Sequence, residues 1–394
     1  MMNANQSTAE NFSFLEGGLF RKAQIKLGLD HSQGKLALIG LCFAWIPLSI
    51  LTAIEGTLYS GTDLPLLKDI AMNARLLLAL PMLIAIRNII DIKTTAVIRY
   101  FTESLLDAEG RQRMLSITLP RIRKLACSSL TEVIIILIVI SFMMGLLSSG
   151  VYSGLQSGST SWKFVGAADG NVISMAGKWA VFVSIPFFQF LLLQWIWRYL
   201  MWMLLMLRFA QAPLKLLPTH ADRAGGLGII ILAQRTFNTI FIACSIVIAS
   251  QLMVFISRHS ESISTVRIEV IGFVVFCLML LILPLVFFAG KLVKTKQLGL
   301  LHLSQLSVEL SSTFEKEWLN DIPLEKRIED QHVDPSMAFD YGSMYDTLQQ
   351  LRVIPITLRD IISLAAMLLV PFIPILFIYY SAAEVMQKLL GLLM

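Results

Sequence analysis

The stretch that decides the fold runs from Leu130 to Leu147 and reads LTEVIIILIVISFMMGLL. Its one charged residue is Glu132, near its start, and its apolar residues follow one another without alternation. A helix needs about twenty such residues to cross about 30 Å of hydrocarbon. Backbone groups in lipid must be satisfied within the segment, which favours a helix over an isolated strand. The stretch therefore predicts a transmembrane helix.

Six more apolar runs of similar length lie on either side of this stretch. The protein has 394 residues, of which 56% are hydrophobic and 15% are charged, and its mean hydropathy is +0.71. Soluble domains carry about 25% charged residues, so the surplus apolar surface must face lipid. The sequence predicts an all-α integral membrane protein, a polytopic bundle of about seven transmembrane helices with a helical cytoplasmic segment. The other predicted spans are Leu36–Ile54, Met72–Ile90, Trp179–Met201, Phe237–Ile256, Val270–Gly290 and Ile361–Tyr380.

The basic residues predict how the chain is oriented. Lys and Arg gather in the N-terminal segment and in the connections after the second, fourth and sixth predicted spans. Basic loops stay on the cytoplasmic side, so we expect the N-terminus in the cytoplasm and, with seven spans, the C-terminus on the opposite side of the membrane. The net charge of +5 is spread along span ends, which indicates contact with membrane lipids and not with nucleic acid.

Four parts follow from this pattern. The segment 291–360 repeats Leu303, Leu306 and Leu310 at helical spacing, which predicts an amphipathic cytoplasmic helix. The four parts are a cytoplasmic N-terminal segment with an interfacial helix (1–35), a six-span transmembrane region (36–290), the cytoplasmic amphipathic segment (291–360), and the last span with a C-terminal tail (361–394).

A glycine-rich turn between the fourth and fifth predicted spans is the main candidate site. Glycines permit positive φ and close backbone approach, and backbone N–H groups before a helix bind anions such as phosphate or a lipid headgroup. A histidine here is also a candidate proton carrier. The alternative is a capped structural turn, which we favour because the phosphate-loop spacing is missing. The candidate residues are His220, Asp222, Arg223, Gly225, Gly226 and Gly228.

Two arginines inside predicted spans are candidate interfacial or pathway charges. Arg198 follows Trp195 and Trp197, a combination typical of an interfacial belt in which the arginine reaches the headgroups. Arg75, near the opposite membrane face, has the same interpretation. The alternative for both is a charge that faces the bundle interior and marks a pathway. We favour the belt.

Residues typical of catalysis or of metal binding are missing from the pattern. The centres of the predicted spans hold almost no Asp, Glu or His, the histidines lack ligand spacing, and the four cysteines form no motif. Coupled carriers generally need ionisable groups at membrane depth. We therefore predict no catalytic residue, no metal and no cofactor.

The chain resembles a family of polytopic inner-membrane proteins of Gram-negative bacteria that carries a W-x-W-R … H-x-D-R-A-G-G-L-G motif. The motif covers Trp195–Arg198 and His220–Gly228, and Leu351-Arg352-Val-Ile-Pro355 belongs to the same resemblance. The family turn resembles His-Pro-Asp, where this chain has Ala221, and Arg87 stands where an acid is expected. The resemblance implies a bacterial inner membrane, with the predicted N-terminus in the cytoplasm and the C-terminus in the periplasm. It also marks the turn, but it implies no activity.

Three functions remain open at this stage. A channel-like or permease-like bundle fits the prolines within the spans and a glycine turn at the inner mouth. A membrane scaffold or sensor would act through residues 291–360 on a membrane or cytoplasmic protein, or on another copy of this chain. A membrane enzyme acting on lipid would depend on His220 and Asp222 alone, and it is the weakest of the three.

Overall fold

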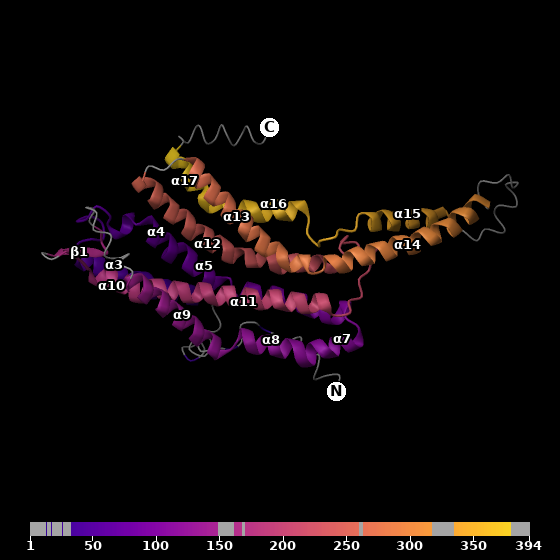
Figure 1. The fold of residues 1–394 in the computed structure, drawn as a ribbon, viewed down its shortest axis with the longest axis horizontal. Coiled ribbons are helices and arrows are strands. Elements are labelled where there is room, and N and C mark those ends of the chain that lie inside the picture. The colour runs from indigo at the N-terminus through magenta and orange to yellow at the C-terminus, as the bar shows by residue number, and fades with distance from the viewer. Residues whose placement is uncertain are drawn as a thin grey trace.

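The computed structural model describes residues 13, 17, 26, 33–148, 161–167, 170–259, 263–316 and 335–379. These residues are almost entirely helical and form an elongated bundle with a two-helix arm at one end (Figure 1). The α-helices are α3 (Gln33–Ile54), α4 (Ile70–Asn73), α5 (Leu80–Ala85), α6 (Arg87–Tyr100), α7 (Ala108–Arg113), α8 (Leu119–Ala126), α9 (Ser129–Ser148), α10 (Met175–Trp179), α11 (Ile185–Gln211), α12 (Ile230–His259), α13 (Ile263–Val286), α14 (Ala289–Phe314), α15 (Pro335–Gln349), α16 (Leu358–Leu369) and α17 (Ile373–Tyr379).

Six helical stretches among the described residues are long and apolar enough to cross a membrane. Each contains most of one predicted span, so the all-α polytopic fold is confirmed. All six begin before the predicted bounds, because the helix continues into polar sequence on that side, whereas Val266–Val286 ends before the predicted Gly290. The six stretches are Gly34–Ile54, Ala108–Ser148, Met175–Gln211, Leu227–Ser257, Val266–Val286 and Leu358–Tyr379.

The predicted second span, Met72–Ile90, is not among the six, because helix breaks near Ile86. The segment from α4 to α5 nevertheless runs antiparallel to α3 and in contact with it. The indole of Trp45 donates to the Asn73 side chain at 3.0 Å near one end, and Gly40 packs on Ile84 further along. This segment packs against α3, α11 and α12, with Leu76, Leu80 and Leu83 buried and Leu78 exposed. The second pass is therefore a short helix with one face buried in the bundle.

Prolines explain most of the irregular helix in the bundle. Three π-helical segments, η2 (Ala74–Ala79), η4 (Met114–Thr118) and η5 (Ala180–Ser184), each precede an α-helix with proline as its second residue. Proline has no N–H and its ring clashes with the carbonyl four residues earlier, which disturbs the regular hydrogen bonding of the preceding turn. The helix therefore widens just before Pro81, Pro120 and Pro186, whereas Pro47 and Pro284 lie within α-helices.

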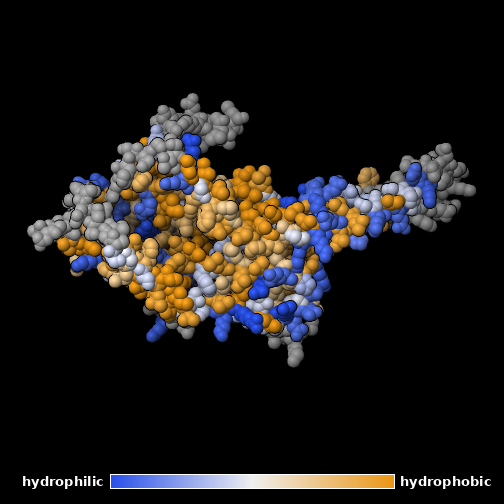
Figure 2. Space-filling model, in the orientation of Figure 1, coloured by the Kyte–Doolittle hydropathy of each residue, from blue (hydrophilic) through white to orange (hydrophobic). Residues whose placement is uncertain are grey.

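The interior of the bundle is packed with large apolar side chains. Leu48, Leu80, Trp202 and Phe237 come from four helices and are almost fully buried in one cluster. Many other apolar side chains point outward, and Figure 2 shows the bundle covered by hydrophobic surface, whereas the arm is mostly hydrophilic. This distribution is that of a protein whose bundle lies in lipid.

A short β-hairpin closes one end of the bundle, which we call the hairpin end. Strands β1 (Phe164–Ala167) and β2 (Gly170–Ile173) pair antiparallel, with Phe164 opposite Ile173. Both strands lie in the connection between the third and fourth predicted spans. Just before β1, the buried Trp162 donates its indole N–H to Asp69 at 3.1 Å, and Lys163 forms an ion pair with the same carboxylate at 3.0 Å.

The opposite end, which we call the turn end, carries the glycine-rich turn and the arm. The arm consists of α14 and α15, which lie side by side and project beyond the bundle (Figure 1). Both helices fall within the predicted 291–360 segment, although α14 begins two residues earlier and follows α13 after only Phe287 and Phe288. The predicted interfacial helix in residues 1–35 and the C-terminal tail lie mostly outside the described residues.

Candidate functional site

The turn between α11 and α12 depends on three residues with positive φ. Gly225 has φ 66°, Gly226 has φ 92° and Arg223 has φ 51°. Side chains other than glycine rarely adopt this conformation. A Cβ at Gly226 would also meet the Tyr100 hydroxyl and a Leu105 methyl at 3.2 Å. The glycines therefore serve both the path of the chain and its close packing on α6 and η3 (Phe101–Leu105).

Asp222 is the centre of the turn. Its Oδ1 accepts the backbone N–H groups of Ala224 at 2.8 Å and Gly226 at 3.1 Å, and its Oδ2 accepts that of Gly228 at 2.9 Å. Burial alone would raise the pKa of Asp222, but these hydrogen bonds and the contact with His220 outweigh it and lower the pKa below its usual value. The carboxylate therefore stays ionised.

His220 contacts the same aspartate in two ways. Its Nδ1 lies 2.8 Å from the carboxylate Oδ1 of Asp222 and 3.2 Å from the backbone nitrogen of Asp222. A neutral Nδ1 accepts the backbone N–H, whereas a protonated Nδ1 donates to the carboxylate. Both states therefore hold the imidazole against the turn.

This geometry bears directly on the expected anion site. The backbone N–H groups that were expected to bind phosphate or a headgroup donate instead to the carboxylate of Asp222. The carboxylate of Asp222 therefore takes the place, among these backbone N–H donors, that an external anion would occupy. The capped structural turn, favoured from the sequence, accounts for these contacts, and an external anion at the turn stays a prediction.

Arg352 connects the arm to the turn, a role that the sequence pattern did not reveal. Its backbone N–H donates to the Arg223 carbonyl at 2.9 Å. Its guanidinium donates to the carbonyls of Asp222 and, at 3.4 Å, of Arg223. The Arg352–Pro355 stretch was part of the family resemblance, but nothing in its spacing pointed to residues 130 positions earlier.

Two further contacts hold the base of the arm. The ammonium of Lys296, on α14, donates to the carbonyls of Gln349 at 2.6 Å and Leu351 at 3.0 Å, at the end of α15. Gly299 lies so close to Pro218 that a Cβ there would come within 2.9 Å of the proline ring. The arm is therefore fixed to the turn by charge-assisted hydrogen bonds and by close packing.

Beside the arm, α12 and α16 are joined by an ion pair between Arg235 and Asp360. Asp360 also forms a capping box with Thr357 at the start of α16, where each side chain accepts the other residue's backbone N–H. The contacts at the turn end therefore extend from the arm to two of the long apolar helices.

Arg198 lies inside the bundle rather than at its surface. Its side chain is only 5% exposed, its guanidinium stacks 5.0 Å from the Trp195 ring, and its Nε has no hydrogen-bond partner among the described residues. It lines a small cavity with Arg87 and Gln194. An arginine of an interfacial belt would reach the surface, so the geometry agrees with the inward-facing alternative. Whether it marks a pathway stays a prediction.

The neighbourhood of Arg198 is rich in buried polar groups. Gln194 donates to the buried Glu132 at 2.8 Å, and Ser13 donates to both oxygens of Asp91 at 2.8 and 2.9 Å. None of these side chains was a candidate from the sequence, because each stands alone in an apolar or mixed run. Arg75 lies apart from this cluster, half-buried, 5.9 Å from the Phe188 ring.

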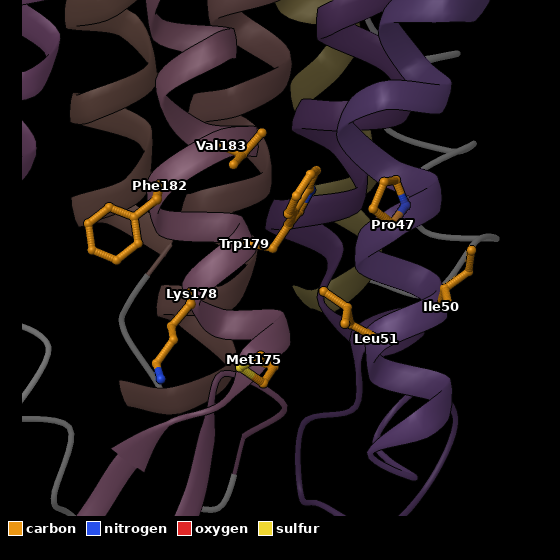
Figure 3. Close-up of a pocket in the computed structure, with 8 residues that line it drawn as sticks. All are labelled: Pro47, Ile50, Leu51, Met175, Lys178, Trp179, Phe182 and Val183. Atoms are coloured by element: carbon orange, nitrogen blue, oxygen red, sulfur yellow. The ribbon is translucent and has the colours of Figure 1, made fainter.

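An open groove between α3 and α10 carries no such chemistry. It has a volume of about 570 Å³, and Figure 3 shows Trp179 between the two helices, opposite Pro47 and Leu51. Its lining is apolar except for Lys178 and the indole of Trp179. The described residues also contain no group of three or more His, Cys, Asp or Glu arranged to hold a metal ion. The groove is therefore a hydrophobic surface feature.

Comparisons of the chain with protein-family models, with curated proteins and with solved structures find no match. The turn, the arm anchored to it and the buried Arg198 cluster are thus interpreted from their own geometry, and membership of the inner-membrane family stays a prediction.

Proposed function

We propose that this multi-pass membrane protein is a scaffold or sensor whose arm, α14 and α15, binds a protein partner on the cytoplasmic side. The observation that carries the proposal is the contact of Arg352 with the carbonyls of Asp222 and Arg223. This contact ties the projecting arm to the connection between two long apolar helices. A displacement of the arm by a partner would therefore act on the bundle.

A contiguous set of contacts supports this coupling. At its base, α14 is separated from α13 only by Phe287 and Phe288. On its other side, the chain passes from α15 through Arg352 into α16, which Arg235 joins to α12. Coupling between distant sites needs such packed and hydrogen-bonded elements. Moving the arm would change the forces on α12, α13 and α16 together.

The arm also presents apolar side chains away from the bundle. Leu301 is 55% exposed, Val308 is 73% exposed and Phe339 is 81% exposed. Leu301 and Val308 are seven residues apart, two helical turns, and so share one face of α14. An amphipathic helix with exposed apolar residues at this spacing is a common recognition surface for proteins.

A second candidate, an anion-conducting permease, is favoured by the buried Arg198. A guanidinium inside a bundle with an unpaired Nε is an expensive feature that commonly belongs to a substrate or ion path. Against this candidate, the bundle interior is filled by large apolar side chains such as Trp202, Phe237 and Leu80, all nearly fully buried. Conduction would require this packing to open.

Site-specific photo-crosslinking tests the first proposal. A photoreactive residue at Val308, on the arm, should give one discrete adduct with another protein in native membranes. Leu301→Asp should abolish that adduct, and the same probe at Ile138, on the lipid-facing side of α9, should not form it. The proposal fails if Val308 yields no adduct, or an adduct that Leu301→Asp leaves unchanged. The same purified protein in liposomes should show no protein-dependent flux of chloride or phosphate, and such flux would favour the permease.

A further inference from the structure

A second groove, at the turn end, has a different chemical character from the apolar one. It lies between the helical stretch 108–126 and the end of α11, and it has a volume of about 380 Å³. Three of its lining residues are arginines, Arg113, Arg121 and Arg208. Among the residues that the structure describes, no aspartate or glutamate lines it. The groove therefore concentrates positive charge.

The arginines are arranged along the groove. Arg113 and Arg121 are eight residues apart on the same helical stretch, which is about 12 Å along the axis at 1.5 Å per residue. Arg208 comes from the opposite wall, on α11. Among the described residues, no carboxylate lies within ion-pairing distance of the three, and Arg208 makes one long hydrogen bond, 3.4 Å, to Gln211. Their charge is available to a ligand.

Apolar side chains fill the spaces between the arginines. Ile117 and Leu125 are exposed on the wall formed by η4 and α8, while Leu204 faces them from α11. A free phosphate ion would leave these apolar side chains without a contact. A neutral amphiphile would leave three arginines without an anionic partner, since the described residues supply no carboxylate to them. The combination fits a molecule with an anionic head and hydrocarbon chains.

The position of the groove fits the same ligand. Leu125, at one end of the groove, lies four residues before α9 begins, and α9 carries no charged residue after Glu132 in its first turn. The Trp197 indole donates to the Leu125 carbonyl at 3.2 Å. Tryptophan is enriched where helices leave the hydrocarbon. The groove therefore starts where the headgroup layer is expected and extends away from the membrane core.

We propose that this groove is a binding site for an acidic glycerophospholipid. The phosphate is held by Arg121 and Arg208, and the acyl chains pass over Leu125 toward the surface of α9. The site is independent of the turn and of the arm's proposed partner, because it uses none of their residues.

Lipid exchange into nanodiscs tests the site. The full protein is placed in phosphatidylcholine nanodiscs with a minor share of phosphatidylglycerol, and the lipids retained on the protein are counted by native mass spectrometry. The wild type should retain phosphatidylglycerol preferentially. The variant R113Q/R121Q/R208Q should lose this preference by about a hundredfold, at roughly fivefold for each basic residue near an anionic lipid. The control R99Q/K124Q/K215Q removes the same charge from exposed positions outside the groove and should keep the preference.

Three results would overturn the proposal. The first is equal retention of phosphatidylglycerol by the wild type and the arginine variant. The second is an equal loss in the control, which would indicate a diffuse surface potential. The third is displacement of the lipid by inorganic phosphate, which would indicate a site for the free ion. If the triple variant does not fold, Arg121→Gln and Leu125→Asp replace it, and both must weaken retention, because one removes charge and the other disturbs the acyl path.

Discussion

The two ends of the bundle are each organised by one aspartate, but the two aspartates are satisfied in different ways. At the hairpin end, Asp69 is 2% exposed and accepts hydrogen bonds from the Met72 N–H and, from 93 residues away, the Trp162 indole, and it pairs with Lys163. At the turn end, all three backbone donors to Asp222 lie within six residues of it.

This difference in their hydrogen-bond partners indicates that Asp69 and Asp222 have different structural roles. Asp69 fastens a distant segment to the start of α4, so its loss should free that segment while α4 stays in place. Asp222 shapes its own turn, and the turn then presents its carbonyls to Arg352. Its loss should therefore disturb the turn first and the arm as a consequence. The predictions below test this distinction, beginning with the largest expected effect.

Replacing Asp222 with Ala should have the largest effect on stability. The N–H groups of Ala224, Gly226 and Gly228 would lose their acceptor in a largely buried turn. Leaving buried donors unsatisfied costs about 1–3 kcal/mol each where no water replaces the acceptor, so we expect a loss of about 2–4 kcal/mol. Thermal unfolding of the purified protein in detergent measures it. Membrane insertion should be unchanged, because the apolar runs determine it.

Asp107→Ala is the matched control for that variant. Asp107 caps α7 at the same end of the bundle, but it accepts only one backbone N–H, from Gly110. Loss of a helix N-cap costs about 1 kcal/mol. If Asp222→Ala is no more destabilising than Asp107→Ala, the turn does not depend on its carboxylate.

Replacing Asp69 with Asn should have a smaller effect, because Asn keeps an oxygen that can accept from the Met72 N–H or the Trp162 indole. The ion pair with the partly exposed Lys163 is lost. We expect about 1–2 kcal/mol, confined to the hairpin end. Limited proteolysis should cut the variant faster within 161–173 and at an unchanged rate near the turn. Faster cleavage at both ends would show that the two regions are not independent.

Acid should weaken both ends. Burial alone would raise the pKa of Asp69, but Lys163, the Met72 N–H and the Trp162 indole together lower it, and the pKa of Asp222 is lowered as well. A carboxyl whose pKa falls on folding stabilises the protein fully above its unfolded pKa of about 4. That stabilisation is lost as the pH falls through the folded pKa. At pH values below about 4, the melting temperature should therefore fall. It should fall less steeply with pH in Asp222→Ala than in the wild type. An equally steep fall in the variant would exclude a contribution from this carboxyl.

The sequence predicted the membrane fold well, because lipid imposes a simple requirement of length and apolarity on each span. It placed the second span less well, because Leu76, Leu80 and Leu83 are apolar through burial among other helices and not through contact with lipid. Apolarity alone does not distinguish these two causes. The break near Ile86 also left no signal in the hydropathy.

The candidate site was predicted in part. The glycines of the turn followed from local rules of backbone geometry. Asp222 was a candidate as a residue that positions a ligand or pairs with Arg223, and its bonds to the backbone of the turn were not predicted. The hydrogen bonds of Arg352 and Lys296 could not be predicted from such local rules. Both side chains bind backbone carbonyls, and every residue has one. Arg198 was assigned to the interface from its tryptophan neighbours. The direction of a helix side chain depends on which face packs inward, and α11 has apolar residues on every face, so its sequence does not identify the inward one.

The central claim is that Arg352 fastens the arm to the turn, and hydrogen–deuterium exchange on Arg352→Ala tests it most directly. We predict faster amide exchange in the variant both at 217–228 and at 341–352, with exchange in α3 unchanged. Arg111→Ala, which removes another hydrogen bond from a guanidinium to a carbonyl at the same end, is the control and should leave both segments as in the wild type. Unchanged protection of residues 217–228 in Arg352→Ala would contradict the claim, because the turn would then be independent of the arm.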